Sequence, residues 1–148
     1  MVFLHKLNDQ QFLFRNWKEQ PTWVGATDFE IPEHTDIPLV VHPYGCVYRD
    51  RMATALKLAG QNWRIAYSSP GIGGVQRAVR DGLGLSCLTV PTVLSGMRRF
   101  AEEDGLPVLP PLHIGLFARQ AQLGAGGYAA IDAMVDSLEA QAADQNFE

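Results

Sequence analysis

The chain has 148 residues, which is enough for one domain or part of one. Its 19 % charged and 47 % hydrophobic residues are ordinary globular proportions and exclude a disordered chain or a coiled coil. The 12 Lys and Arg against 16 Asp and Glu give a net charge of −4, which argues against gripping nucleic acid through a basic face.

Export and metal-binding signals are missing from the sequence. No apolar run approaches the roughly 18 residues of a membrane span, and the first residues lack the pattern of a signal peptide. The only cysteines, Cys46 and Cys87, form no disulfide framework, so the sequence predicts a cytoplasmic protein. The four histidines are scattered without zinc-site spacing, and we expect no metal and no cofactor.

The period of the apolar residues changes repeatedly along the chain and predicts alternating strands and helices. Segments with alternating or continuous apolar residues predict strands at 21–27, 38–42, 63–67, 85–90 and 112–118. Segments with apolar residues at helical spacing predict helices at 47–59, 71–81 and 128–140, with a short helical turn starting at Pro91. Polar or Pro- and Gly-rich segments predict loops at 30–36, 98–111 and 120–127.

Residues at the helix ends predict where the helices begin and stop. Gly60 and Gly82 are placed to supply a left-handed residue just past two helices. Ser69 is a candidate N-cap with Pro70 at the first helical position. The helix at 71–81 is expected to bury three apolar side chains: Ile72, Val75 and Val79.

This order of elements predicts an α/β fold with mostly parallel strands and two right-handed crossovers in the middle of the chain. The outer strands at 21–27 and 112–118 flank that middle. The middle, about 28–110, is therefore expected to form one lobe, and the two ends are expected to come together in another.

Five segments resemble, in order and spacing, the effector-binding domain of LysR-type transcriptional regulators: WVGAT, PLVVHPYGC, YRDRMATALKLAG, WRIAYSSPGIGGVQRAVRDGLGLSCLTV and LPPLHIGLFARQ. The resemblance spans about 17–138. Its most specific parts are the strand–turn–helix units around Pro43–Cys46 and Ser68–Gly71, the second ending in GLGLS.

The resemblance implies a fold like type 2 periplasmic binding proteins, with two Rossmann-like lobes, a two-strand hinge and a small effector between the lobes. Residues 1–27 then resemble a remnant of lobe 1 with the outgoing hinge strand. Residues 28–110 resemble a complete lobe 2, and 111–148 resemble the return hinge strand and the C-terminal helix of lobe 1. The family's helix-turn-helix is not in this chain, so the resemblance implies DNA contact only through a part that is absent here.

Two turns lie where a predicted strand ends and a helix begins. Free N–H groups and the positive end of a helix dipole converge at such turns, and ligands of open α/β sheets bind there. With the resemblance, the turns predict effector binding, for example of an organic acid, by His42, Pro43, Tyr44, Gly45, Cys46, Ser68, Ser69, Pro70 and Gly71. The competing interpretation is that the serines only cap the helix.

Two alternative functions are a stand-alone interaction module, which would form mixed dimers with full-length regulators, and a small α/β enzyme. Cys46 near a helix start, four residues after His42, could form a nucleophile pair, but no third group is marked to hold the base. The turn at Gly71 is similar to a dinucleotide fingerprint, but Gln76 replaces the third glycine. We therefore expect a sensing domain and not an enzyme.

The resemblance implies that the first lobe is incomplete in this chain, and this predicts which partners the chain binds. Missing strands leave a sheet edge and apolar surface open, and such edges pair with another chain. The sequence thus predicts a homodimer or other homo-oligomer with a small-molecule effector, and no membrane partner.

Overall fold

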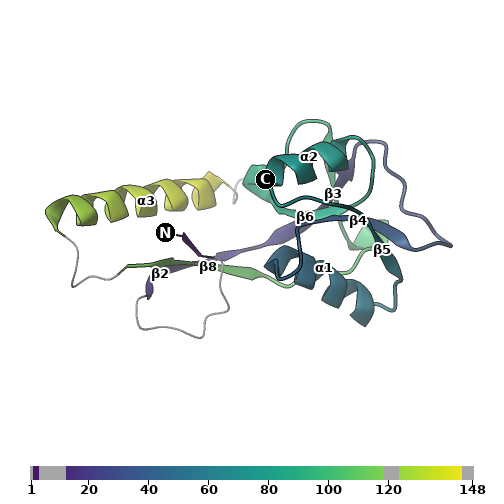
Figure 1. The fold of residues 1–148 in the computed structure, drawn as a ribbon, viewed down its shortest axis with the longest axis horizontal. Helices are drawn as coiled ribbons and strands as arrows, with labels where there is room; N and C mark the ends of the chain where they lie inside the picture. The colour runs from purple at the N-terminus through teal and green to yellow at the C-terminus, as the bar shows by residue number, and fades with distance from the viewer. Residues whose placement is uncertain (1, 4–12, 119–123, 145–148) are drawn as a thin grey trace. The chain divides into compact units, whose positions relative to one another are not determined.

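The structure is a computed structural model that describes residues 2–3, 13–118 and 124–144. The chain divides into two compact units, each of which we describe by itself (Figure 1). Unit 1 comprises Met1–Glu19 and Leu112–Glu148, and unit 2 comprises Gln20–Pro111. The chain therefore passes between the units twice, once after Glu19 and once after Pro111.

Unit 2 is built on five strands: β3 (Pro21–Ala26), β4 (Ile37–Val41), β5 (Trp63–Ser68), β6 (Ser86–Thr89) and β7 (Met97–Phe100). Strand β3 lies between β6 and β7 and is antiparallel to both, whereas β4 and β5 are parallel. A parallel bridge between Leu39 and Leu85 connects these two groups of strands. Two 3-10 helices complete the unit, at Val90–Thr92 and Glu102–Asp104.

Helices α1 (Val47–Leu58) and α2 (Ile72–Arg80) lie on opposite sides of this sheet (Figure 1). Successive side chains of a strand point to opposite faces, so each buried strand supplies both cores. The cluster that includes α1 takes Trp23, Leu39, Val41 and Cys87. The cluster that includes α2 takes Val24, Val40 and Leu88. Burial of each large apolar side chain stabilises the unit by about 1.5–3 kcal/mol.

Unit 1 contains the antiparallel strands β1 (Val2–Phe3), β8 (Leu112–Phe117) and β2 (Leu13–Glu19), in the order β1-β8-β2. Helix α3 (Ala125–Asp144) packs on them. Its buried residues Ile131 and Val135 contact Leu116, and Phe14 and Trp17 pack around this cluster. An α/β architecture is thus present in both units.

The expectation of mostly parallel strands is wrong for the described strands. Only the β4–β5 ladder and the bridge from Leu39 to Leu85 are parallel, and every other described pairing is antiparallel. The apolar runs report burial on both faces, which is common in parallel sheets, but a central antiparallel strand such as β3 is buried in the same way.

The sequence analysis missed two strands, β2 and β7. Strand β2 carries exposed Arg15, Asn16 and Lys18, so its apolar alternation is weak. Strand β7 buries only Phe100 and exposes Arg98 and Arg99. Both strands lie at the edge of a sheet, where polar residues are tolerated. These polar residues interrupt the apolar alternation that indicates a strand. Next to β7, Arg98 forms an ion pair with Asp104 at 3.1 Å.

The predicted helix ends are confirmed, but one predicted start is wrong. Gly60 and Gly82 follow α1 and α2 with φ of +69° and +76°, the left-handed conformation that glycine adopts most easily. Helix α2 begins at Ile72 with Gly71 as its N-cap, so Ser69 and Pro70 lie before the helix. Ile72 is also 44 % exposed instead of buried.

Candidate functional site

The two predicted turns lie side by side at one edge of unit 2. Strands β4 and β5 are parallel neighbours whose last residues, Val41 and Ser68, are paired in register. The N–H of Ser69 donates to the carbonyl of Val41 at 3.0 Å, which joins the start of one turn to the start of the other. The structure therefore brings the segments His42–Cys46 and Ser68–Gly71 together, although they are more than twenty residues apart in the sequence.

The first turn leads from β4 into α1. Gly45 has a φ of +89°, and the N–H of Cys46 donates to the carbonyl of Pro43 at 3.3 Å, which closes the turn. Cys46 is the N-cap residue, and no side chain caps the helix there. Tyr44 is 90 % exposed, with the guanidinium of Arg49 at 5.4 Å from its ring centroid. The turn thus presents a ring, a cation and helix N–H groups toward solvent.

The second turn leads from β5 into α2, and its two serines differ. Ser68 is exposed, whereas Ser69 is buried and its hydroxyl donates to the carbonyl of Gly71 at 3.2 Å. The Ser69 hydroxyl therefore holds the turn itself, so the interpretation of this serine as a helix cap is wrong. Among the described residues, no acceptor binds the N–H groups of Ile72 and Gly73 in the first turn of α2.

A third strand, β6, ends at the same edge; the strand was predicted at 85–90, but its end was not predicted to lie beside the two turns. Because Leu39 of β4 pairs in parallel with Leu85, the following strand β6 carries Thr89 to the end of the sheet where β4 also ends. The Thr92 hydroxyl donates to the carbonyl of Thr89 at 2.7 Å, and Gln76 of α2 donates to the carbonyl of Thr92 at 2.8 Å. The strand predicted at 85–90 could have indicated this, because the carboxyl ends of parallel strands lie at the same edge of a sheet.

The possible Cys46–His42 nucleophile pair gains no support from the geometry. The hydrogen bonds of the described residues include none between Cys46 and His42. The ring of His42 lies instead beside the ring of Tyr48, with centroids 6.3 Å apart. The other thiol, Cys87, belongs to the core, and burial raises its pKa well above the usual range. It is a packing residue.

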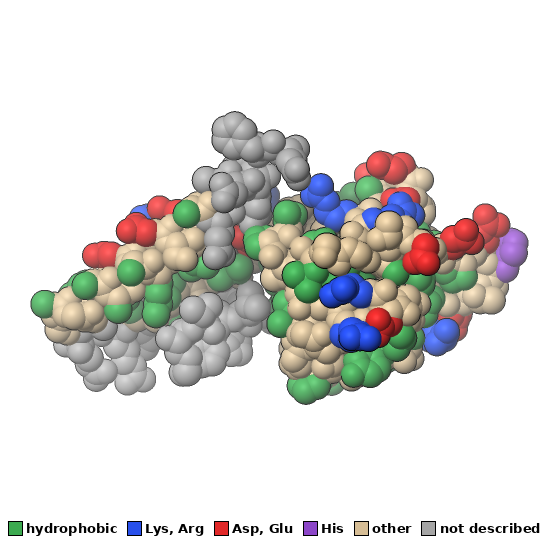
Figure 2. Space-filling view, turned by 90° about the horizontal axis from the view of Figure 1, so that it is seen from above, with side chains coloured by type: hydrophobic (Ala, Val, Ile, Leu, Met, Phe, Trp, Pro, Cys, Tyr) green, Lys and Arg blue, Asp and Glu red, His purple; other side chains and the backbone are tan. Residues whose placement is uncertain are grey.

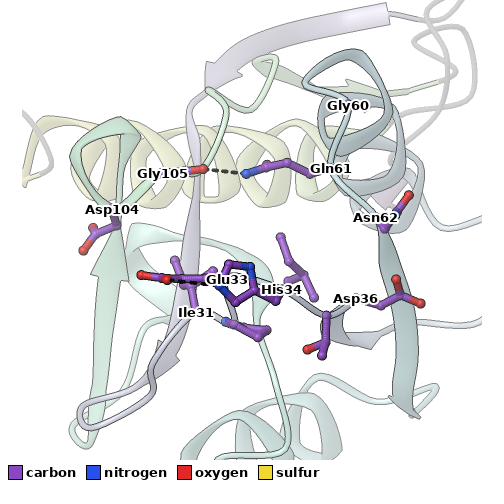
Figure 3. Close-up of a pocket in the computed structure, with 12 residues that line it drawn as sticks. Ile31, Glu33, His34, Asp36, Gly60, Gln61, Asn62, Asp104 and Gly105 are labelled. Carbon is purple, nitrogen blue, oxygen red and sulfur yellow. Dashed lines mark hydrogen bonds and ion pairs between the residues drawn. The ribbon is translucent and has the colours of Figure 1, made fainter.

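A hollow of about 580 Å³ lies at the opposite edge of the sheet, where β4 and β5 begin (Figure 3). Gln61 reaches across it and donates to the carbonyl of Gly105 at 2.7 Å. The carboxylates of Asp36 and Asp104 lie on opposite sides of this view and do not converge. Asp104 is already bound to Arg98 and to the N–H of Ala101. This hollow is separate from the predicted turns.

The described residues form neither a metal-binding cluster nor a membrane-spanning helix. No group of three or more His, Cys, Asp or Glu in the described part of the chain is arranged to hold a metal ion. None of the described helices has the length and apolar character needed to cross a lipid bilayer. On the face drawn in Figure 2, Lys and Arg side chains are interspersed with Asp and Glu instead of forming one basic surface.

The chain is similar to a known domain family and to curated proteins described as transcriptional regulators. Residues 15–142 match the model of the family described as LysR substrate binding domain. Over 94 residues the chain is 31 % identical to the HTH-type transcriptional regulator PecT of Dickeya dadantii, an alignment that covers 63 % of this chain and 30 % of PecT. The chain thus corresponds to less than a third of that curated relative.

Solved structures with the same fold are more distant in sequence. Full-length HypT from Salmonella typhimurium, a LysR-type transcriptional regulator, aligns with a TM-score of 0.64 at 19 % identity, over 94 % of this chain and 50 % of HypT. The CcmR regulatory domain of Synechocystis PCC6803, solved in complex with 2-PG, aligns with a TM-score of 0.61 at 12 % identity, over 92 % of this chain and 71 % of CcmR. The fold is therefore α/β and like that of type 2 periplasmic binding proteins.

Proposed function

Because this chain belongs to the family of LysR substrate binding domains, we propose that it senses a small-molecule effector and does not catalyse a reaction. The observation that carries the proposal is the pair of helix starts at one sheet edge, where β4 and β5 end side by side. Each start directs N–H groups and the positive end of a helix dipole outward, an arrangement that favours a carboxylate or another anionic group. We take an organic acid as the effector class.

The proposed effector-binding residues are those of the two turns: His42, Pro43, Tyr44, Gly45, Cys46, Ser68, Ser69, Pro70 and Gly71. The turns contribute in different ways. Main-chain donors carry the anion contact, Ser68 is free to contribute its hydroxyl, and Ser69 shapes the second turn from within. The complex of CcmR with 2-PG supports a small ligand for this fold.

In the intact regulator, we propose that effector binding between two lobes biases their relative orientation. Residues 28–110 would form the complete second lobe, with 1–27 and 111–148 supplying hinge strands and part of the first lobe. The two compact units support this division, although β3 packs within unit 2. Contact with DNA would come from a helix-turn-helix outside this chain, as the solved complex of Vibrio fischeri DarR with DNA suggests for a relative.

The protein is proposed to work in the cytoplasm as a homodimer or other homo-oligomer, with no membrane partner. The support for association is the sheet of unit 1, whose strands β1 and β2 are edge strands in the described structure. Light scattering over a range of concentrations tests this part. A protein that stays monomeric at high concentration would contradict it.

The site is tested by removing single main-chain donors without changing the helices. Proline is well tolerated at the first position of a helix, after an extended residue, and it lacks an N–H. Ile72 and Val47 occupy that position in α2 and α1, after Gly71 and Cys46 with extended ψ of 142° and 129°. Ile72→Pro and Val47→Pro therefore delete one donor each.

The matched controls are Ile72→Ala and Val47→Ala, which shorten the same side chains and keep the N–H. Small carboxylates are screened by thermal shift, and the acid that binds is titrated by calorimetry. We expect the proline variants to bind about 10- to 100-fold more weakly than the alanine variants, as for a lost hydrogen bond to a charged group. Equal affinities for proline and alanine variants would exclude the two helix starts as the binding site.

A further inference from the structure

The two places where the chain passes between the units are unusually short. Strand β2 ends at Glu19 and β3 begins at Pro21, so Gln20 is the only residue between them. On the return, only Pro110 and Pro111 separate Leu109, which is buried in unit 2, from β8. Any change in the angle between the units must therefore be absorbed by a few backbone bonds at these two crossings.

Prolines remove several main-chain hydrogen-bond donors beside these crossings. In unit 1, strands β2 and β8 are paired up to Glu19 and Leu112. Immediately beyond that pair, Pro21, Pro110 and Pro111 have no N–H to donate. The ladder therefore loses three of its possible donors here, and no main-chain hydrogen bond joins Gln20 to residues 109–111 in the described structure.

The side chain of Gln20 makes a hydrogen bond between these segments. Its amide Nε2 donates to the carbonyl of Leu109 at 2.8 Å, across 89 residues of sequence, and also lies 3.3 Å from the carbonyl of Pro21. Nearby, the indole N–H of Trp23 donates to the carbonyl of Pro107 at 2.8 Å. The outgoing strand thus holds the return segment through two side-chain donors, and the Gln20 bond lies next to the crossings.

We propose that Gln20 is a positioning residue whose amide clasps the two crossings together, so that unit 1 and unit 2 bend about one paired hinge. The clasp is the bond from Gln20 Nε2 to Leu109 O. The clasp itself does not depend on the proposed function. Only the role of the bending in the response to an effector rests on that function. Without the clasp, the pairing of Glu19 with Leu112 and the bond from Trp23 to Pro107 still connect the two segments, but the crossings are held less firmly and the range of orientations of the units is expected to widen.

Gln20→Met tests the clasp because methionine keeps the length of the side chain and lacks the donor. Gln61→Met is the matched control: Gln61 makes the same kind of bond to Gly105 at 2.7 Å in the same unit, away from the crossings. Hydrogen exchange is measured by mass spectrometry on peptides covering 17–23 and 109–115. We expect about fivefold faster exchange there in Gln20→Met and wild-type exchange in Gln61→Met, as for one lost hydrogen bond.

A second measurement reports the orientation of the units. Dyes are attached to Lys57→Cys in α1 and Asp136→Cys in α3, both exposed positions, in a Cys46→Ser background, since Cys87 is buried. Single-molecule energy transfer is expected to show a broader distribution of distances in Gln20→Met than in Gln61→Met. Equal widths together with unchanged exchange at the crossings would overturn the proposal.

A folding failure would not obscure the result. Melting curves identify a variant that does not fold, and Gln20→Glu then replaces it, because a carboxylate also lacks the donor. Both measurements are made without any effector. Failure to find an effector would count against the proposed function and would leave the clasp intact, whereas unaltered hinge motion would count against the clasp alone.

Discussion

The hydroxyl of Ser69 lies directly over the Cα of Gly74, so close that a Cβ built on Gly74 would collide with Ser69 Oγ and lie 2.9 Å from its Cβ. The hydroxyl is held there by its bond to the carbonyl of Gly71. The turn before α2 is therefore folded back onto the first turn of the helix. This contact explains a glycine inside a helix, where glycine is otherwise unfavourable.

Gly74→Ala is expected to destabilise unit 2 by about 1–3 kcal/mol, because overpacking at a closed contact outweighs the better helix propensity of alanine. Gly73→Ala is the control, since a Cβ at Gly73 meets nothing within 4 Å, and this variant should be stabilised by about 0.5–1 kcal/mol. Urea denaturation measures both. A double-mutant cycle with Ser69→Gly should show that the cost of Gly74→Ala depends on the Ser69 side chain.

The thiols of Cys46 and Cys87 should differ in reactivity because they differ in exposure to solvent. Cys46 is partly exposed at the start of α1, whereas Cys87 is 1 % exposed in the core and burial raises its pKa. Since the thiolate is the reactive form, a neutral thiol reagent should modify one thiol per native chain and the second only in denaturant. Cys46→Ser should abolish the native reaction. Rapid modification of two thiols in the native protein would show that the core around Cys87 opens.

Removal of one partly buried hydrogen bond should loosen the attachment of the return segment to β3. Trp23→Phe keeps an aromatic ring in the core but leaves the carbonyl of Pro107 without the indole donor. Loss of this hydrogen bond should cost about 0.5–1.5 kcal/mol, so the urea midpoint should fall accordingly. Thr22→Val, a neighbour whose hydroxyl lies at a long 3.4 Å from its acceptor, is the control and should change stability little.

The elements of unit 2 that carry the candidate site were largely predictable from the sequence. Apolar runs around Val40 and helical spacing at Met52 and Val75 report burial directly, and burial dominates the folding of these segments. Strand–turn–helix order then places the turns at one edge, as the pairing of Val41 with Ser68 bears out.

Other features depend on contacts between distant residues, which local patterns do not encode. The antiparallel direction of β3 relative to its neighbours is such a feature, because buried parallel and buried antiparallel strands have similar amino-acid composition. The contact of Ser69 with Gly74 is another, and it outweighs the local tendency of serine to cap a helix. The bond from Gln20 to Leu109 spans 89 residues and involves an exposed polar side chain, so no periodicity reveals it.

The stability of the protein should respond to pH through Glu19, at the end of β2. One carboxylate oxygen of Glu19 is buried and has no hydrogen-bond partner among the described residues. Burial disfavours the charged form and raises the pKa of Glu19 above its ordinary value of 4.5. Between that value and the raised pKa, the folded chain binds more protons at this site than the unfolded chain does. Stability contributed by Glu19 is therefore lost as pH rises through this interval.

Glu19→Gln removes the charge and keeps the shape of the side chain, so its advantage in stability over wild type should grow as pH rises above 4.5. Well below pH 4.5 the carboxyl is protonated in both the folded and the unfolded chain, so the advantage of the variant should be smaller at pH 4 than at pH 7. Urea midpoints at pH 7 and pH 4 measure the two cases, with Glu139→Gln, an exposed carboxylate paired with Arg15, as the control. A variant less stable than wild type at pH 7 would mean that the Glu19 carboxylate has a stabilising partner.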